Sequence, residues 1–474
     1  MRKRLRVLAT VVLVVAVVAA VQSNGGGSSA RFRPVTAARS LPPVPKPYFV
    51  SPAKQDVESF ELAGNARGDA VLLWTEYARF GHTRLWMRAK RAGGSFGRPR
   101  ALSGVHMDGV EPHAAVGDDG TEVVTWRELD RGKTSQKVAS RRAGGSFAIK
   151  TLSSSRTPAS TIYLGDASQL AISRDGTALL VSVGFVGGAS QVVARARSTN
   201  GRWSRPQVVT TGRRGVRYPT VAFDGTGTAI LAWERGKREF PDNAAPPVKQ
   251  EIRVAVRPPG GRFGKPRRVS NPQQDARDAA LAANARGDAA LLWNSTHGRN
   301  LPGSRVGMAV RRAGKGFGAP HLLTPPGEAW LTQGALGPEG SLVVVWSEDR
   351  KKGKRFWCGC PRLVAARGSV DSGVGPSNVL SSRAAEWPSL ASDAAGDVFA
   401  TWLLYPTGGS GVNRVQGRFA SADGSLGPVI QLSPPHDHAD PKALLYPDRT
   451  AFAAWTRLRH GRSRIEAVHI RVRP

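Results

Sequence analysis

A tryptophan-marked phrase recurs along the chain and restricts its possible folds more than any other feature. In each copy a Gly in a polar turn precedes an apolar stretch, and a Trp stands six residues after that Gly. The complete copies are Gly68 to Trp74, Gly120 to Trp126, Gly227 to Trp233, Gly287 to Trp293, Gly340 to Trp346 and Gly396 to Trp402. Two copies are degenerate, with Ser182 in the Trp position and Arg449 in the Gly position before Trp455. A fixed period of ~50–60 residues indicates a repeat architecture.

Each repeat is predicted to contain four short strands, which we call a, b, c and d. In the second repeat they cover 112–116, 122–128, 137–142 and 150–153, where apolar and polar residues alternate between turn residues. The a–b turn is short and contains the marker Gly. The c–d turn recurs in related forms at 93–97, 144–147, 200–203, 260–264 and 314–318. The b–c and d–a connections vary, so we expect recurring turns at one end of the unit and variable loops at the other.

Four-stranded units with this period are typical of a β-propeller, in which radial packing leaves only short strand edges. We predict an all-β, single eight-bladed β-propeller, with seven blades as the alternative if the third repeat, which lacks its Trp, is merged. The last repeat ends after its c strand, and residues 48–51 match the pattern of the d strands. The N-terminal strand is therefore expected to complete the last blade.

The N-terminus has the pattern of a secretory signal. Basic residues at 2–6 precede an apolar stretch at 7–21 that is shorter than the ~20 residues of a spanning helix, and small residues follow it. We expect a signal peptide at 1–21, a flexible Gly/Ser/Pro-rich tether at 22–46 and the propeller at 47–474. An uncleaved anchor is the alternative. After cleavage no transmembrane span would remain, and the protein would be secreted or held at the cell surface.

Two turns link the repeats to a known family. Ser198-Thr199-Asn200-Gly201-Arg202-Trp203 and Ser421-Ala422-Asp423-Gly424-Ser425-Leu426 resemble the Asp-box turn, S-x-D-x-G-x-x-W, of sialidase-like propellers. The resemblance covers nearly all of the folded part. It implies a glycoside-cleaving activity that depends on an Arg triad, a Tyr with a Glu partner, an Asp and an F-R-I-P motif. Of the last motif this chain has Phe32-Arg33-Pro34, without the Ile.

A candidate binding site follows from position in the repeat. Nine residues before the turn Gly lies the start of strand a, which faces the mouth of the central channel of a propeller. This position holds Ser59, Glu111, Ala167, Tyr218, Asp278, Leu331, Trp387 and Asp440. Carboxylates, aromatic rings and Arg side chains at one mouth suit a carbohydrate or a cation. We predict the ligand-binding residues Glu111, Arg217, Tyr218, Arg277, Asp278, Trp387 and Asp440, with the alternative that these are ordinary rim residues.

Strand b ends in a carboxylate at the same end of several repeats, at Glu76, Glu128, Glu234 and Glu348. No residue is assigned a catalytic role, and no metal or cofactor is expected. We predict that Glu111, Asp278 and Asp440 surround the channel without pairing at the distance that a hydrolase needs.

Several local motifs have simpler structural interpretations. The G-x-S-x-G match at 93–97 and the Arg-Gly-Asp tripeptides at 67–69 and 286–288 fall in predicted turns. Cys358 and Cys360 are expected to form a tight local disulfide rather than a metal or redox site. The stretch 436–440, with two His and two Asp, is expected to be a solvated polar loop rather than a zinc or copper site.

The chain is strongly basic, with 68 Lys and Arg against 35 Asp and Glu and a formal charge of +33. Such a charge attracts anionic partners, although an even spread over the surface is the alternative. No nucleic-acid-binding module is recognised. We therefore expect a secreted, non-catalytic, monomeric binding module for a carbohydrate or an anionic cell-surface polymer. The alternative is a sialidase-like glycoside hydrolase acting at the channel mouth.

Overall fold

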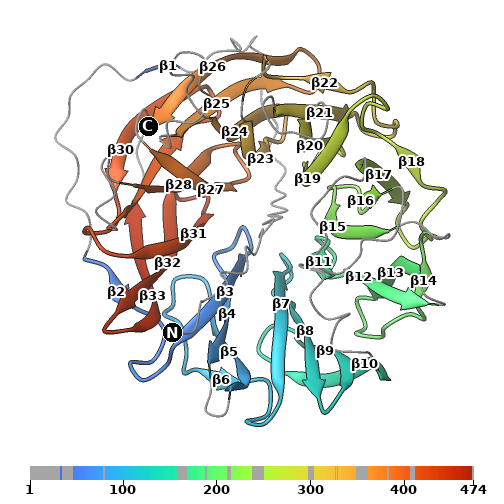
Figure 1. Ribbon diagram of the computed structural model, residues 1–474, viewed down its shortest axis with the longest axis vertical. Helices are drawn as coiled ribbons and strands as arrows, with labels where there is room; N and C mark the ends of the chain where they lie inside the picture. Colours follow the sequence, from blue (N-terminus) through green and yellow to red (C-terminus); the bar gives the residue numbers. More distant parts are fainter. Residues whose placement is uncertain are drawn as a thin grey trace, which may run out of the picture.

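Each sequence repeat folds into one antiparallel sheet whose four strands follow one another in chain order. The computed structural model describes residues 33–34, 46–77, 81–156, 168–186, 189–210, 215–236, 250–296, 304–325, 327, 329–348, 361–381, 384–405 and 412–471. Eight such sheets surround a common axis as the blades of a propeller (Figure 1). The predicted all-β, eight-bladed fold is confirmed, and the seven-bladed alternative is wrong.

The blades are numbered here in chain order. Blade 1 contains β3 (Val57–Gly64), β4 (Ala70–Tyr77), β5 (Thr83–Lys90) and β6 (Arg100–Ala101). Blade 2 contains β7 (Asp108–Val116), β8 (Glu122–Asp130), β9 (Lys133–Arg141) and β10 (Ala148–Arg156). Blade 3 contains β11 (Ser168–Ile172), β12 (Ala178–Val186), β13 (Ala189–Arg197) and β14 (Gln207–Val208). Blade 4 contains β15 (Val216–Phe223), β16 (Ala229–Gly236), β17 (Gln250–Arg257) and β18 (Arg267–Arg268).

The second half of the ring repeats this plan. Blade 5 contains β19 (Asp275–Ala283), β20 (Ala289–Thr296), β21 (Arg305–Arg311) and β22 (His321–Leu322). Blade 6 contains β23 (Ala329–Leu336), β24 (Ser341–Glu348), β25 (Arg362–Ser369) and β26 (Gly373–Ser381). Blade 7 contains β27 (Ala385–Ser392), β28 (Val398–Leu404), β29 (Arg414–Ala420) and β30 (Ser425–Gln431), with β1 (Arg33–Pro34) parallel to β30. Blade 8 contains β31 (His438–Leu445), β32 (Thr450–Arg459), β33 (Arg462–Arg471) and β2 (Tyr48–Phe49).

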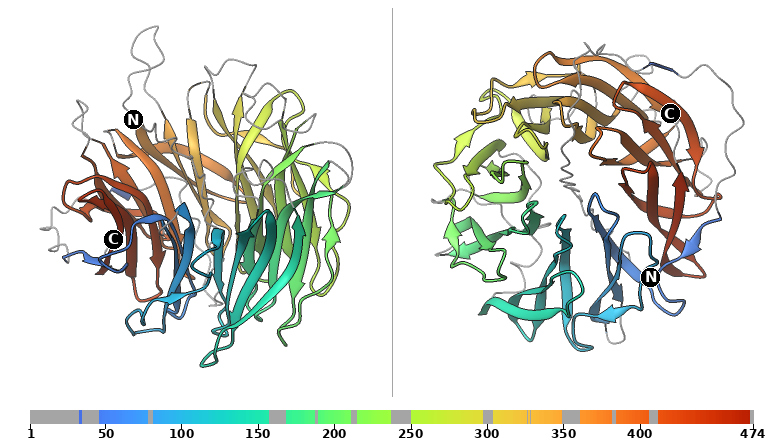
Figure 2. Two further views of the ribbon diagram at one scale, coloured as in Figure 1. Left: turned by 60° about the horizontal axis from the view of Figure 1, so that its bottom comes forward. Right: turned by 180° about the vertical axis from the view of Figure 1, so that it is seen from behind.

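The N-terminal strand closes the ring, as predicted. β2 pairs antiparallel with β33, so that Tyr48 faces Ala467 and Phe49 faces Glu466. The pairing continues past the strand, because Ile465 accepts a hydrogen bond from the Val50 amide at 2.8 Å and donates its own amide to Ser51 Oγ at 2.9 Å. In the second view of Figure 2, blue β2 lies beside the red strands of the last blade. The first and last described blades are thereby joined.

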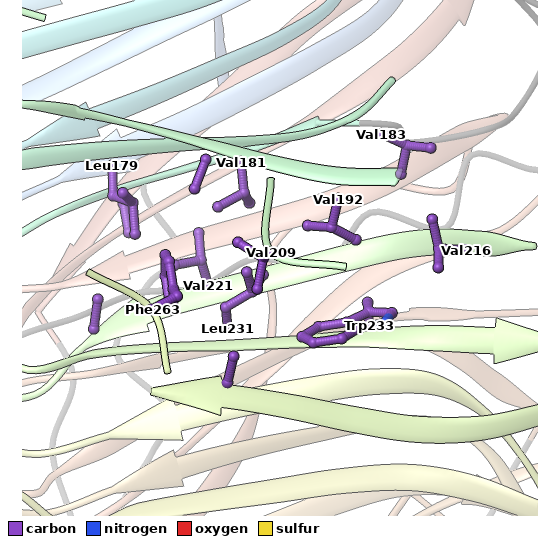
Figure 3. Close-up of a cluster of buried hydrophobic side chains, with 14 of the residues drawn as sticks. Leu179, Val181, Val183, Val192, Val209, Val216, Val221, Leu231, Trp233 and Phe263 are labelled. Carbon is purple, nitrogen blue, oxygen red and sulfur yellow. The ribbon is translucent and has the colours of Figure 1, made fainter. Parts of the chain in front are cut away.

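The core lies in the seams between blades rather than inside any one of them. Eight clusters of buried apolar side chains each combine residues of two neighbouring blades. In the seam between blades 3 and 4, Val181 and Val192 of blade 3 meet Leu231 and Trp233 of blade 4 (Figure 3). A sheet with two apolar faces is stable only when both are covered. Each blade therefore depends on both neighbours.

The marker Trp of every repeat that has one fills the seam with the preceding blade. These side chains are at most 2% exposed: Trp74, Trp126, Trp233, Trp293, Trp346, Trp402 and Trp455. Blade 3 has Ser182 at this position, and its seam with blade 2 is built from the smaller residues Ala115, Val123, Val138, Leu170, Ala178 and Leu180. Trp203 of the c–d turn packs against that cluster.

The c–d turns add a second wedge to the same seams. Their aromatic side chains pack against the seam clusters at Phe96, Phe147, Phe263 and Phe317. The first Gly of each of these turns has a positive φ, for example 69° at Gly93 and 67° at Gly260, which favours Gly because it has no Cβ. The segment 93–97 is thus a turn between strands, as predicted, and not a nucleophile elbow.

The Arg-Gly-Asp tripeptides are also structural. Asp69 and Asp288 are 5% and 1% exposed. Asp69 accepts hydrogen bonds from Asn65 Nδ2 at 2.9 Å and from the Ala92 amide at 3.1 Å, and Asp288 accepts one from the Ala313 amide at 3.0 Å. These carboxylates tie the a–b turn to the c–d turn, so both turns lie at the same end of the blade.

Among the described residues no helix is long and apolar enough to cross a membrane.

A Cβ at Gly307 would test the tightness of the seams. Gly307 faces Trp293 across the β20–β21 pairing, and a Cβ there would overlap the indole Nε1 and Cε2. We expect Gly307→Ala to lower the free energy of unfolding by about 1–3 kcal/mol through overpacking. Gly316→Ala is the control, because no atom lies within 4 Å of its Cβ position. Urea unfolding that shows equal stability for the two variants would contradict this packing.

Removing the closing strand should open the ring. Deletion of residues 1–51 removes β2 and Val50, which is 2% exposed in the cluster between blades 8 and 1. We expect a loss of about 3 kcal/mol or more in unfolding free energy and increased binding of an apolar dye, because a core residue and several strand hydrogen bonds disappear. Deletion of residues 1–45 is the control, because it removes the two-residue β1 of blade 7 but keeps β2, and it should lower the urea midpoint much less than deletion of 1–51. Equal midpoints would show that closure contributes nothing.

Candidate functional site

Six blades share a backbone irregularity at the start of the innermost strand. The a–b pairing shifts register there, for example between Arg217 and Thr220 and between Arg277 and Ala280. One non-Gly residue of each irregularity is left-handed, with φ of 47–57°: Glu111, Tyr218, Asp278, Leu331, Trp387 and Asp440. We call these the bulge residues, and the end of the ring that carries them the bulge end. The left-handed region costs an L-residue roughly 1–3 kcal/mol.

The bulge residues occupy the repeat position predicted for the channel mouth. In blade 1 the corresponding Ser59 also adjoins a register shift but is not left-handed, and Ala167 of blade 3 lies outside the described residues. The first strand of each blade is innermost (Figure 1). The bulge residues therefore stand nearest the axis at the end opposite the a–b and c–d turns.

Blades 4, 5 and 6 are connected at the bulge end by a chain of hydrogen bonds. Glu234, 1% exposed at the end of β16, accepts the Asp278 amide on Oε1 at 2.6 Å. Asn294 Nδ2 donates to Asp278 Oδ2 at 2.8 Å, and Thr332 Oγ1 donates to Asn294 Oδ1 at 3.1 Å. A buried amide and a carboxyl from different blades thus hold the Asp278 bulge in place.

Glu234 is a neutral acid in this environment. Burial raises its pKa from 4.5 to about 8, and the adjacent Asp278 carboxylate acts in the same direction. The Asp278 amide and the guanidinium groups of Arg217 and Arg277 oppose this shift without cancelling it. Burial also raises the pKa of Asp278. Strongly shifted carboxyls are enriched at functional sites, although structural networks produce them too.

Two Arg side chains and a Tyr flank this pair. The Arg217 guanidinium lies 5.8 Å from the centre of the Tyr218 ring. Arg277 donates to Asp275 Oδ2 from Nη2 at 2.6 Å and from Nε at 3.1 Å, which fixes the plane of its guanidinium. Burial is the main cause that raises the pKa of Tyr218. Four of the predicted residues, Arg217, Tyr218, Arg277 and Asp278, thus form one cluster around Glu234.

The other three predicted residues belong to separate blades. Glu111 accepts Arg127 Nη1 on both carboxylate oxygens, at 3.1 and 3.2 Å. Trp387 is half-buried and packs against the seam between blades 7 and 8. Burial raises the pKa of Asp440, and Lys442 opposes the shift. Glu111, Asp278 and Asp440 therefore have different surroundings in blades 2, 5 and 8. That no two of these carboxylates lie as close as the catalytic pair of a hydrolase stays a prediction.

A second buried group lies two residues beyond the bulge position. Lys442 Nζ of blade 8 is 3.4 Å from Glu61 Oε2 of blade 1, and both residues are buried. Burial, helped by the Lys442 charge, lowers the pKa of His113 in blade 2 to about 4, so this imidazole is neutral at pH 7. The group brings together buried polar side chains of blades 8, 1 and 2.

Sequence reasoning overlooked Arg127, Asn294 and Thr332. Arg127, Glu234 and Asn294 each directly follow the marker Trp of strand b, and this position faces a bulge. The other carboxylates at strand b ends face strand c instead. Glu76 accepts Trp86 Nε1 at 2.6 Å, Glu128 pairs with Lys137 at 3.2 Å, and Glu348 pairs with Arg362. The residue directly after the marker Trp was therefore the feature of the sequence that could have identified the partners of the bulge residues.

The stretch 436–440 differs from the predicted solvated loop. His438 is 2% exposed, packs against Trp455 with a ring-centre distance of 6.1 Å, and contacts the Pro434 carbonyl at 2.9 Å through Nε2. It is buried because β31 begins here, next to the marker Trp of its own blade. Among the described residues no cluster of three or more His, Cys, Asp or Glu could hold a metal ion. Cys358 and Cys360 lie outside the described residues.

Comparison with known proteins gives only distant likenesses. No family model matches the sequence, and no curated protein matches it either. The solved structures similar to it include the polysaccharide lyase Uly1, at 12% identity and a TM-score of 0.46, with 89% of this chain and 97% of that chain covered. They also include an ulvan lyase, at 9% identity and 0.42, with 84% and 89% covered. The α-L-arabinofuranosidase of Fusarium graminearum matches at 13% identity and 0.36, with 77% and 93% covered. At this level the likenesses assign no residue a role.

The buried carboxyl makes stability depend on pH. The folded chain keeps the Glu234 proton up to about pH 8, whereas the unfolded chain loses it near 4.5. Stability from this group is therefore present below pH 4.5 and is lost as pH rises toward about 8, by up to about 1.4 kcal/mol per pH unit. Glu234→Gln keeps the acceptor for the Asp278 amide and should abolish that loss. Urea unfolding of both proteins from pH 5 to 8 tests it, and a constant difference in stability would contradict a neutral Glu234.

Proposed function

We propose that this protein is an exported, non-catalytic binding module whose bulge end recognises a carbohydrate that carries an anionic group. The observation that carries the proposal is the identity of the bulge residues. Gly or Asn tolerates the left-handed region at least cost, yet the six positions hold Glu, Tyr, Asp, Leu, Trp and Asp. Residues that are costly for the backbone favour a role for their side chains.

The chemistry of these side chains suits a saccharide. Tyr218 and Trp387 are half-buried, so part of each ring remains accessible, and aromatic faces stack on the apolar faces of sugar rings. Arg277 is fixed by Asp275 at 2.6 Å. A guanidinium held in one plane favours the planar, bidentate recognition of a carboxylate. These groups come from blades 4, 5 and 7, so the ligand would span the bulge end rather than enter one blade.

Export is inferred from the sequence alone. The basic residues at 2–6 and the apolar stretch at 7–21 support a secretory signal, and the Gly/Ser/Pro-rich composition of 22–46 suits a link between a membrane and the propeller. An extracytoplasmic location agrees with a polysaccharide ligand.

Binding to a panel of neutral and acidic oligosaccharides tests the proposal. Arg277→Gln should weaken binding of acidic ligands about tenfold, which is what one lost charge-assisted contact of about 1.4 kcal/mol produces. Trp387→Leu should weaken neutral and acidic ligands alike, because it removes the stacking face. Arg459→Gln, exposed at the β32–β33 turn, is the charge-matched control for Arg277→Gln.

Two outcomes would contradict saccharide recognition. One is the absence of binding to any oligosaccharide by calorimetry at low salt. The other is binding that Arg277→Gln and Arg459→Gln weaken equally and that about 0.5 M salt abolishes, since screening of that kind marks bulk charge rather than a shaped site.

A sialidase-like glycoside hydrolase is the second candidate, and one observation favours it. Glu234 retains its proton at neutral pH beside Asp278 and Tyr218, and glycoside cleavage requires a protonated acid next to a second carboxylate or another nucleophile. Turnover of aryl glycosides that is abolished by Glu234→Gln and by Asp278→Asn would replace the binding proposal with this one.

A further inference from the structure

Exposed basic side chains collect at the c–d turns and outer strands of blades 1–5. They include Arg98, Lys150, Arg205, Lys265, Arg267 and Lys315, all exposed. The segments 91–107, 137–156, 195–210, 252–274 and 304–324, which hold these turns and strands, contain no Asp or Glu. Blades 6 and 7 differ, because Asp371 and Asp423 occupy their c–d turns. We call the surface of blades 1–5 formed by these turns and outer strands the basic arc.

The basic arc is continuous over blades 1 to 4, because the c–d turn or the outer strand of each blade contacts the c–d turn of the next. The Arg100 guanidinium of blade 1 lies 5.9 Å from the Phe147 ring centre in the turn of blade 2. Arg142 of that turn donates to the Thr199 carbonyl in the turn of blade 3 at 2.8 Å. Gln207 of β14 exchanges two hydrogen bonds of 3.0 Å with the Phe263 backbone in the turn of blade 4.

The arc ends where acidic residues begin. Arg312, in the c–d turn of blade 5, pairs with Asp371 of blade 6 at 2.8 Å. In blades 7 and 8 an Arg side chain at this end instead joins two blades. Arg449 of blade 8 pairs with Asp397 of blade 7 at 3.1 Å. Part of the positive charge is therefore paired within the ring, and at the end that carries the c–d turns the exposed, unopposed part follows five of the eight blades.

The shape of the arc favours a flexible linear polyanion. Basic side chains stand both on the turns and on the outward strands β10 and β18, so a partner must follow the curved rim of the ring. Duplex DNA has a persistence length of ~50 nm and would have to be bent to do so. The turn aromatics are directed into the seams, Phe263 being 7% exposed. They therefore supply no stacking platform for single-stranded bases and no apolar anchor for a bilayer.

We propose that the basic arc binds a linear acidic polysaccharide, independently of the bulge end. The arc lies at the end of the ring that carries the a–b and c–d turns, opposite the bulge residues. A propeller held by the arc on an anionic polymer layer would present its bulge end away from that layer. Arg and Lys side chains without a packed pocket recognise charge density rather than sugar identity, so binding should depend strongly on salt.

Polygalacturonate is the probe, with dextran as its neutral counterpart. The test variant carries Arg98→Ser, Arg205→Ser, Lys265→Ser and Lys315→Ser, one change in each of blades 1, 3, 4 and 5. The control variant carries Arg131→Ser, Lys133→Ser, Arg414→Ser and Arg459→Ser, which are exposed at the bulge end, outside the arc, and remove the same charge. At low salt the test variant should bind polygalacturonate at least about tenfold more weakly and with a shallower salt dependence, whereas the control should stay within about twofold of the unaltered chain.

Equal losses in the two variants, or binding to dextran, would overturn the proposal, because bulk charge or sugar contacts would then account for binding. Tighter binding to duplex DNA or to vesicles of phosphatidylglycerol and phosphatidylcholine than to polygalacturonate would overturn the choice of partner. Trp387→Leu, made at the bulge end, should retain full affinity for polygalacturonate. If the bulge end binds no saccharide, the polygalacturonate test of the arc is unaffected. If the arc binds no polygalacturonate, the saccharide test of the bulge end is likewise unaffected.

Discussion

Packing across the seams between blades is the interaction on which the rest of the structure depends. Each marker Trp belongs to one blade and is buried against the preceding one, as Trp233 is between blades 3 and 4. No blade can cover both of its apolar faces alone. Closing the ring solves this for all eight at once, because the cluster that contains Trp74 joins blade 1 to Phe452 and Ile465 of blade 8.

The candidate site is a product of the same arrangement. The innermost strands start close to the axis, and the bulges there hold Tyr218 and Asp278 in a left-handed backbone. Neighbouring blades then supply partners that no single repeat contains. Glu234 directly follows Trp233 on β16, so it faces the opposite seam, between blades 4 and 5, where it is buried and meets the backbone of the next blade. The raised pKa of Glu234 is therefore a consequence of how the blades pack.

The sequence could predict the blade plan because the Gly-to-Trp spacing and the d-strand pattern at 48–51 are local signals of repeated structure. It could also locate the bulge position, since that position has a constant distance from the turn Gly. The left-handed backbone at Trp387 and Leu331 could not be predicted from the sequence, because neither residue type favours that conformation. The partnership of Asn294 with Thr332 depends on how two blades meet, and no spacing within one repeat encodes that register. His438 was misjudged because its proximity to Trp455 is a property of strand pairing.

The closing strand sets the order in which this chain can fold. The hydrogen bond between the Ile465 amide and Ser51 joins residues 414 positions apart, and contacts of such long range form slowly because a very large loop must be closed first. The outer edge of β33 stays unpaired until β2 pairs with it, and unpaired edges promote association between chains. Final assembly must therefore wait until both ends of the propeller sequence are available to pair.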